Sequence, residues 1–236
     1  MTYPPPGVRF VGYGNANRPS GGVSRLRRTG LGPAYAGPMP STPIRITVRE
    51  FQLVLLRRMA DYHPELVEQA RRELDASVTE MREVNAHWQR MQRSRSFRGG
   101  LSALRGFLGA PLAEQDQRIG DVTCQVTRWK LPLWPDLLYE ALTAVGGFML
   151  AEQLVRDPAS RPPRLESISD LKPWSCVIGD VERAFGPVRH RDGSAPSRWT
   201  MDFTAPDADG KPVAATAEFV WGLLQSVRGI DGSELR

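Results

Sequence analysis

The chain has 236 residues and a mass of 26.3 kDa, which suffices for one core with appended segments. Its 41% hydrophobic and 24% charged residues lie near the globular average, which excludes a chain that is disordered throughout. No stretch reaches the roughly 18 consecutive apolar residues of a membrane-spanning helix, and residues 1–25 lack the pattern of a secretory signal peptide. We therefore expect a cytoplasmic protein without a membrane partner.

The net charge of +5 conceals an uneven distribution along the chain. Residues 1–110 carry 17 arginines against 8 acidic residues, a balance of +9. Residues 111–236 carry 14 basic and 18 acidic residues, a balance of −4. A cationic front half favours contact with a polyanion or with an acidic protein surface.

Residues 1–43 contain eight prolines, eight glycines, five arginines and no acidic residue. Such a segment cannot bury enough apolar surface to offset its chain entropy, which predicts an extended arm and not a domain. Its aromatic residues occur singly, and Tyr13 and Tyr35 are the predicted contacts with a partner. An arm laid across a partner chain and an ordinary disordered terminus share this composition, and both interpretations stay open.

Residues 44–110 are predicted to be helical. Thr47 and Glu50 have the spacing of a capping box, so we expect a first helix to begin there and to end near Ala60. Pro64 suits the first position of a second helix, which is expected to continue to Met91. Beyond it, the glycine pair at 99–100 should stop the helix, and residues 101–108 should form a short amphipathic one.

The second predicted helix carries an apolar stripe with heptad-like spacing. When Val67 is taken as position a, seven of the eight a and d positions are apolar. A stripe this narrow suits one partner helix, either residues 47–60 of the same chain or another chain in a coiled coil. The predicted partner-binding residues on this stripe are Val67, Leu74, Met81, Val84, Trp88 and Met91.

Residues 111–230 are predicted to form an α+β domain, followed by a frayed tail at 231–236. The polar run 114–118 is interpreted as part of a connector that leads to a boundary near Asp121. Val122, Cys124 and Val126 then alternate with polar residues, which predicts a strand.

Residues 137–144 and 148–156 flank a glycine pair, and two interpretations compete for them. The turn chemistry favours a β-hairpin, whereas the leucine, alanine and glutamate content favours helix. We adopt the hairpin. A short helix is expected near Trp174, up to the break at Gly186-Pro187, and a second hairpin from residues 198–205 and 212–220.

The predicted fold class is therefore α+β. An N-terminal irregular arm precedes a helical hairpin or bent helix pair, and a mainly antiparallel β-rich domain with one short helix follows. Trp134 lies between two prolines and is predicted to be an exposed anchor for an interface.

Residues capable of catalysis are present, but no motif groups them. Ser175 or Cys176, His190 and an aspartate could supply a nucleophile, a base and an orienting acid. His190, however, lies in a charged stretch typical of a solvated loop. Asp207 and Asp209 alternate as in a calcium loop but lack the remaining ligands, so a hairpin tip is expected. We predict no enzyme, no catalytic residue, no metal and no cofactor.

Two arginine clusters suggest an alternative in which the chain contacts nucleic acid without sequence specificity. No known recognition motif accompanies them. The arginines concerned are Arg25, Arg27 and Arg28 in the arm, and Arg93, Arg95 and Arg98 after the second helix.

The acid-free arm, the narrow stripe and the lack of an assembled catalytic set favour one hypothesis. The chain is a non-enzymatic interaction or structural subunit of a larger assembly, such as a virus-like particle or a secretion or injection machine. Its partners would be other protein chains, including further copies of itself. A nucleic-acid-associated protein is the alternative, and an enzyme with an unrecognised site is a third class.

Deletion of residues 1–43 is expected to abolish co-purification of partner chains, because the arm is the predicted contact. The melting transition should not change, since a segment of this composition adds nothing to a core. The measurement is the mass of the native complex after mild purification. Unchanged association of the shortened chain would contradict the role of the arm.

Overall fold

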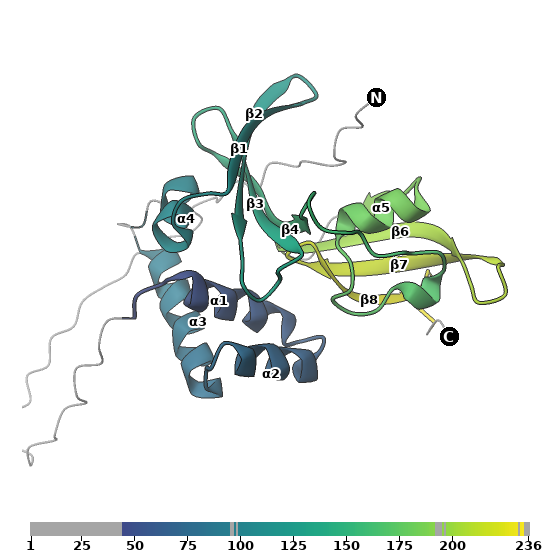
Figure 1. Ribbon diagram of the computed structural model, residues 1–236, viewed down its shortest axis with the longest axis horizontal. Helices are drawn as coiled ribbons and strands as arrows, with labels where there is room; N and C mark the ends of the chain where they lie inside the picture. The colour runs from purple at the N-terminus through teal and green to yellow at the C-terminus, as the bar shows by residue number, and fades with distance from the viewer. Residues whose placement is uncertain are drawn as a thin grey trace, which may run out of the picture.

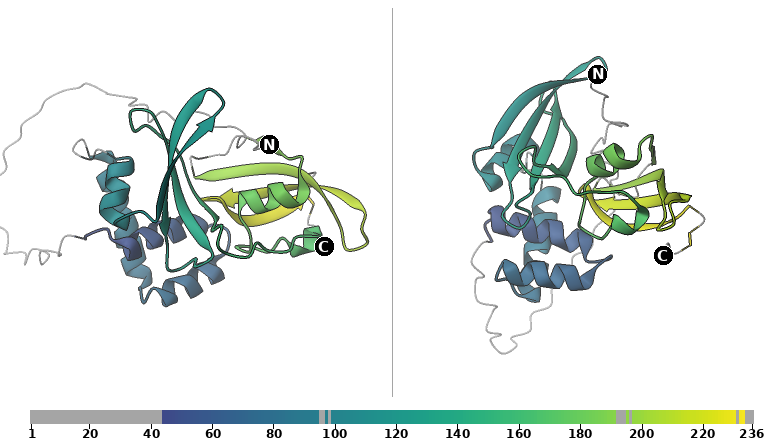
Figure 2. Two further views of the ribbon diagram at one scale, coloured as in Figure 1. Left: turned by 45° about the horizontal axis from the view of Figure 1, so that its top comes forward. Right: turned by 45° about the vertical axis from the view of Figure 1, so that its right-hand side comes forward.

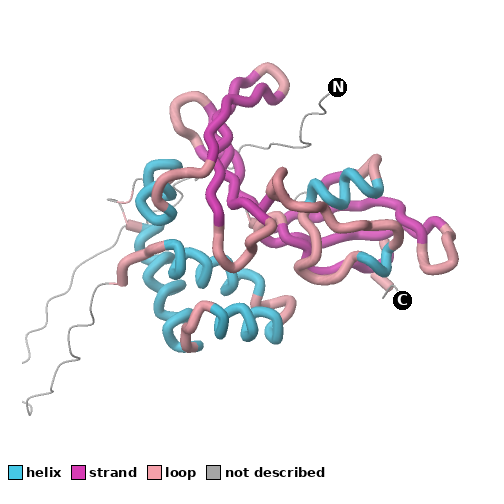
Figure 3. Tube along the Cα trace, in the orientation of Figure 1, coloured by secondary structure: helices cyan, strands magenta, loops and turns pink. Residues whose placement is uncertain are grey.

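The computed structural model describes residues 44–94, 97, 99–191, 195, 197–230 and 232–233. The predicted arm, with Tyr13, Tyr35 and its arginines, lies outside these residues, as do Arg95, Arg98 and most of the predicted tail. The described part is a mixed α+β structure, in which helices come first and two four-stranded antiparallel sheets follow (Figures 1 and 3). This arrangement confirms the predicted fold class. The division into domains stays a prediction.

The helical segment contains α1 (Val48–Met59), α2 (Pro64–Glu73), α3 (Val78–Arg93) and α4 (Leu101–Leu108). Helix α1 is the central element, because it contacts each of the other three. It begins after Thr47 as predicted, and the Glu50 carboxylate accepts the Thr47 backbone N–H at 3.0 Å. Pro64 is the first residue of α2, and α4 has the predicted bounds.

The prediction of one continuous helix from Pro64 to Met91 is wrong. Asp75 adopts a left-handed φ of 47° between α2 and α3, and Ser77 caps the N-terminus of α3. The Ser77 Oγ accepts the Glu80 backbone N–H at 3.0 Å. Arg49 of α1 donates hydrogen bonds to the carbonyls of Leu74 and Asp75, both at 2.8 Å, which satisfies the end of α2. The apolar stripe is therefore divided between two helices, and it forms no continuous coiled-coil seam.

The first sheet has the order β1-β2-β3-β4. Its strands are β1 (Ala113–Ile119), β2 (Val122–Lys130), β3 (Leu137–Ala144) and β4 (Met149–Arg156). The strand at Val122 and the hairpin around the glycine pair are confirmed. The connector predicted at 114–118 is wrong, because these residues form edge strand β1. Sequence alternation did not reveal this strand, since most of its residues are exposed and it depends on pairing with β2.

The second sheet has the order β5-β6-β7-β8 and carries α5 (Ile178–Phe185) on one face. Its strands are β5 (Arg189–Arg191), β6 (Arg198–Pro206), β7 (Pro212–Val220) and β8 (Leu223–Gly229). A 3-10 turn, Ile168–Asp170, precedes α5. The short helix and the β6–β7 hairpin are confirmed. Strand β8 was missed because Trp221, at a φ of 52°, occupies a turn position that normally takes Gly, Asn or Asp.

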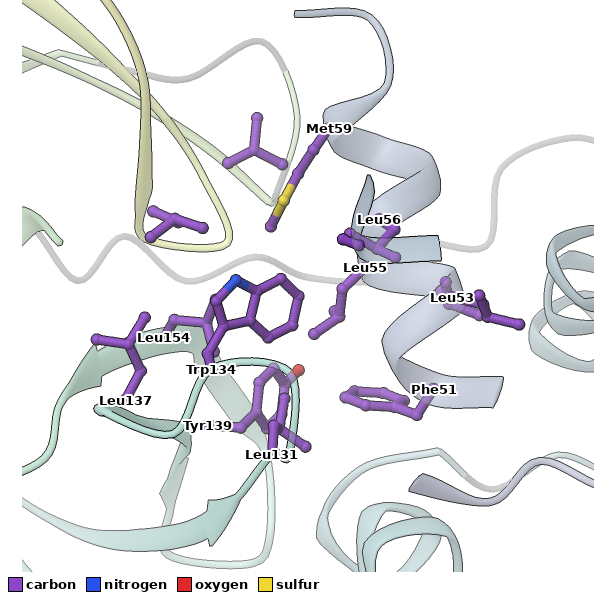
Figure 4. Packing of buried hydrophobic residues seen from close by; sticks show 14 of the residues in the cluster. Phe51, Leu53, Leu55, Leu56, Met59, Leu131, Trp134, Leu137, Tyr139 and Leu154 are labelled. Atoms are coloured by element: carbon purple, nitrogen blue, oxygen red, sulfur yellow. The ribbon is translucent and has the colours of Figure 1, made fainter. Parts of the chain in front are cut away.

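The main core lies between the helical segment and one face of the first sheet (Figure 4). Trp134 belongs to this core and is only 7% exposed, so the prediction of an exposed anchor is wrong. The Trp134 backbone N–H donates to the Leu131 carbonyl, and the Leu137 backbone N–H donates to the Trp134 carbonyl. Two consecutive turns thus place the Trp134 indole in the core. Its ring centroid lies 6.3 Å from that of Trp174, in an edge-to-face arrangement.

The two halves of the described chain join where the β7–β8 turn contacts β4 (Figure 2). The Leu154 N–H of β4 donates to the Trp221 carbonyl at 2.7 Å. Within the second half, the Ile178 N–H of α5 donates to the Gly222 carbonyl at 3.1 Å, so the turn is also bound to α5. Arg156 of β4 forms an ion pair of 2.8 Å with Asp180 of α5, whose side chain is almost fully buried. Strand β4 is therefore tied by its backbone and by a side chain to the second half.

Gly222→Ala is expected to lower the free energy of unfolding by about 3 kcal/mol or more. Gly222 has a φ of +76°, and a Cβ there would lie 2.7 Å from the Leu154 carbonyl oxygen. Gly210→Ala is the matched control, because Gly210 has a φ of +78° with no atom within 4 Å of the added carbon. The control should cost only the backbone strain, about 1 kcal/mol. Chemical denaturation measures both, and equal losses would contradict the close contact.

Candidate binding site

The residues of the predicted stripe lie within the chain's own core. Val67, Met81 and Val84 are buried there, and the other stripe residues are partly buried against the same cluster: Leu74, Trp88 and Met91. Because α3 packs along α1, the structure shows intramolecular packing against residues 47–60, the first of the two alternatives. Contact of this stripe with a second chain stays a prediction.

The arginine clusters are only partly described. Arg93 lies in the last turn of α3, where its guanidinium donates to the Gln89 carbonyl and side chain. Arg95 and Arg98, like the arginines of the arm, fall outside the described residues. Contact with nucleic acid therefore stays a prediction.

The residues considered for a nucleophile and a base have separate partners. Ser175 Oγ donates to the Lys172 carbonyl at 2.7 Å. Burial raises the pKa of the Cys176 thiol to about 12, which leaves it protonated at neutral pH. His190 lies in strand β5 and not in a solvated loop, and its Nε2 is 2.8 Å from Glu182 Oε1.

Neither a metal cluster nor a membrane span is found in the part of the chain that the structure describes. No three histidine, cysteine or acidic side chains are grouped there so that they could hold an ion. No helix within the same residues is long and apolar enough to cross a membrane. Asp207 Oδ1 accepts the backbone N–H groups of Asp209 and Lys211, so these acids form the predicted hairpin tip.

A hollow of about 360 Å³ lies between α3, α4 and the beginning of β4. This volume is within the range of small-ligand pockets. We call it the aromatic hollow and define it by Trp88, Phe97, Phe107, Phe148, Met149 and Glu152.

Ring contacts hold the walls of the aromatic hollow in place. Trp88 of α3 and Phe107 of α4 meet edge to face, with centroids 5.5 Å apart. Phe97 stacks on Phe107 at 6.4 Å with an interplanar angle of 16°. On the core side, Phe51 of α1 contacts both Trp88 and Tyr139. The walls are thus continuous with the main core and are positioned by it.

Glu152 supplies the charge-bearing group of the hollow. The Tyr139 hydroxyl, which is fully buried on neighbouring strand β3, donates to Glu152 Oε1 at 3.1 Å. Burial raises the pKa of the Glu152 carboxyl, and the hydrogen bond from Tyr139 opposes that rise in part. Among the described lysines and arginines, none forms an ion pair with Glu152. A desolvated carboxyl that no described lysine or arginine neutralises marks a candidate site for binding.

Sequence reasoning assigned no role to Glu152 or to Phe148. A β-bulge between Leu142 and Thr143 changes which residues of β4 share a face, so that Met149 and Glu152 line the hollow together. Simple alternation would have placed Leu150 beside Glu152, whereas Leu150 packs in a separate cluster with Cys124 and Val126. The one signal in the sequence was Phe148, an aromatic residue directly after a glycine pair.

Comparison with known proteins assigns no family to the chain. No protein-family model matches it, and no curated protein matches it. A solved structure from Streptococcus mutans, described as a "putative beta-lactamase inhibitor protein", is similar over 59% of this chain and 88% of that one. The sequences are 15% identical and the TM-score is 0.24, a likeness too small to assign a function.

Glu152→Gln is expected to raise the free energy of unfolding at neutral pH. Because burial raises the pKa of Glu152 in the folded protein, the folded chain keeps a proton that the unfolded chain has released only between the two pKa values; above both, the folded chain carries a desolvated carboxylate at a cost in stability. The free energy of unfolding of the wild-type chain therefore falls relative to that of the variant as the pH rises. The fall begins at the pKa of Glu152 in the unfolded chain and ends above its pKa in the folded chain. Chemical denaturation between about pH 4 and pH 8 measures this difference.

Glu140→Gln is the matched control on the adjoining strand. The Glu140 carboxylate pairs with Arg128 at 2.7 Å, so its loss should lower the free energy of unfolding at neutral pH. A Glu152→Gln variant that is less stable than the wild type at neutral pH would show that its carboxyl is not desolvated.

Proposed function

We propose that this chain is a non-enzymatic component of a protein assembly and that it binds other protein chains at one end of its first sheet. The observation that carries the proposal is the exposure of apolar side chains there. Val145 is 80% exposed and Phe148 is 75% exposed, on either side of the glycine pair between β3 and β4. Val122, at the start of β2, is 41% exposed.

The register of the sheet brings these three residues to one end. Strands β2 and β3 are antiparallel, and Cys124 pairs with Ala144 at one end of their ladder. The residues before Cys124 and those after Ala144 therefore extend beyond that same end. Both hairpin ends project at the top of Figure 1. We call Val122, Val145 and Phe148 the apolar tip.

The apolar tip differs from scattered surface hydrophobes because it adjoins the aromatic hollow, which Phe148 also lines. Exposed apolar groups beside a concave aromatic surface are typical of contact sites for other proteins. Covering a phenylalanine side chain on association contributes about 1.5–3 kcal/mol. The neighbouring edge strand β1 is polar, which limits unspecific sheet pairing at this end.

The non-enzymatic part of the proposal is supported by the partners of the reactive side chains. Ser175 is bonded to a backbone carbonyl, the Cys176 thiol is protonated and buried, and His190 is bonded to a glutamate of α5. None of these contacts joins a nucleophile to a base.

The double variant Val145→Ser with Phe148→Ser is expected to release the chain from its native complex. Both side chains are exposed, so the melting temperature should change little, while the apolar contact with the partner is lost. The measurement is the mass and subunit composition of complexes that are purified mildly from the native source.

Ile230→Ser is the matched control, because Ile230 is 54% exposed in the second half of the chain. This variant should keep the complex. A wild-type chain that purifies alone at 26.3 kDa, or a double variant that keeps the wild-type complex, would contradict the proposal.

A further inference from the structure

The aromatic hollow combines two features whose combination restricts the chemistry of its occupant. Its walls are the rings of Trp88, Phe97, Phe107 and Phe148, and its lining includes the carboxyl of Glu152. The rings favour an apolar or flat group. The carboxyl favours a further hydrogen-bond donor or a positive charge, since a desolvated carboxylate with Tyr139 as its one donor among the described residues is costly.

Three classes of occupant fit less well than a cation. A purely apolar group would cover the Glu152 carboxyl and leave its free oxygen without a donor. An anion would be repelled by the ionised carboxylate. A neutral polar group could donate a hydrogen bond but would gain little from the ring faces, whereas a cation is attracted by both the rings and the carboxylate.

The rings beside Glu152 favour a planar donor. Among the described residues Tyr139 donates to Oε1, and the Glu152 carboxyl also lines the hollow with the rings. A guanidinium presents several N–H groups in one plane and stacks on aromatic faces, whereas an ammonium is a compact and strongly hydrated charge. The volume of about 360 Å³ accommodates a side chain of this size.

We propose that the aromatic hollow is a receptor for an arginine side chain of a partner protein chain, with the guanidinium bound to Glu152. This inference rests on the proposed function, because Phe148 belongs to both the hollow and the apolar tip. The partner places apolar residues against the tip and inserts its arginine between α3, α4 and β4. Charge complementarity at Glu152 then selects partners, while the apolar tip supplies most of the buried area.

The experiment titrates the full chain with N-acetyl-arginine methylamide and with the citrulline analogue, which has the same shape and no charge. The methionine methyl groups are labelled with carbon-13, because Met149 lines the hollow, and its signal is assigned with Met149→Leu. Saturable shifts of the Met149 methyl are expected with the arginine probe. The citrulline probe should bind at least about tenfold more weakly, as expected for the loss of a charge-assisted hydrogen bond.

Glu152→Gln should weaken binding of the arginine probe by about tenfold or more, whereas Glu140→Gln on β3 should leave it unchanged. The remaining methyl signals of each variant report whether the fold is intact. Equal binding of the two probes, no effect of Glu152→Gln, or no saturable shift with either probe would overturn the receptor. Tighter binding of the matching lysine probe would overturn the choice of guanidinium.

The two proposals fail in different ways. Glu152-dependent binding of the arginine probe, together with a native complex that survives the Val145→Ser and Phe148→Ser changes, would support the receptor and contradict the apolar tip. Loss of the complex in that double variant without any binding of the arginine probe would support the tip and overturn the receptor.

Discussion

The structure depends on the contact between the β7–β8 turn and strand β4. A backbone hydrogen bond from Leu154 to Trp221 and an ion pair between Arg156 of β4 and Asp180 of α5 join the two halves without any shared strand pairing. The approach is so close that a side chain at Gly222 would meet the Leu154 carbonyl. Glu152 lies two residues before Leu154 on the same strand, so the contact that unites the halves also fixes the strand that lines the aromatic hollow.

Glu152 shows a conflict between stability and binding in this structure. Burial opposes ionisation of its carboxyl, and the hydrogen bond from Tyr139 offsets this only in part. By comparison, Glu140 on the other face of the sheet lies 2.7 Å from Arg128. A carboxyl in a concave site with no ion-pair partner among the described residues is a candidate for binding a ligand. The proposed arginine receptor gives this carboxyl the partner that the described residues do not supply.

Local patterns predicted the elements whose boundaries depend on nearby residues. Thr47, Pro64 and the glycine pair before Phe148 act within one turn of the chain, and α1, α2 and the β3–β4 hairpin begin or turn where expected. The same local reasoning, applied to Ser77 and Glu80, would have ended the second helix correctly, because these residues also have capping-box spacing. The heptad pattern obscured that signal.

The sequence by itself determined the α+β class and most helix and strand positions, because capping, turn chemistry and two-residue alternation act over a few residues. Only the tertiary structure decided that Trp134 is buried, that the polar segment Ala113–Ile119 is a strand and that Trp221 turns the chain into β8. The aromatic hollow also belongs to this second group. Its residues come from two helices, a connecting segment and a bulged strand, and no local pattern specifies how such distant segments meet.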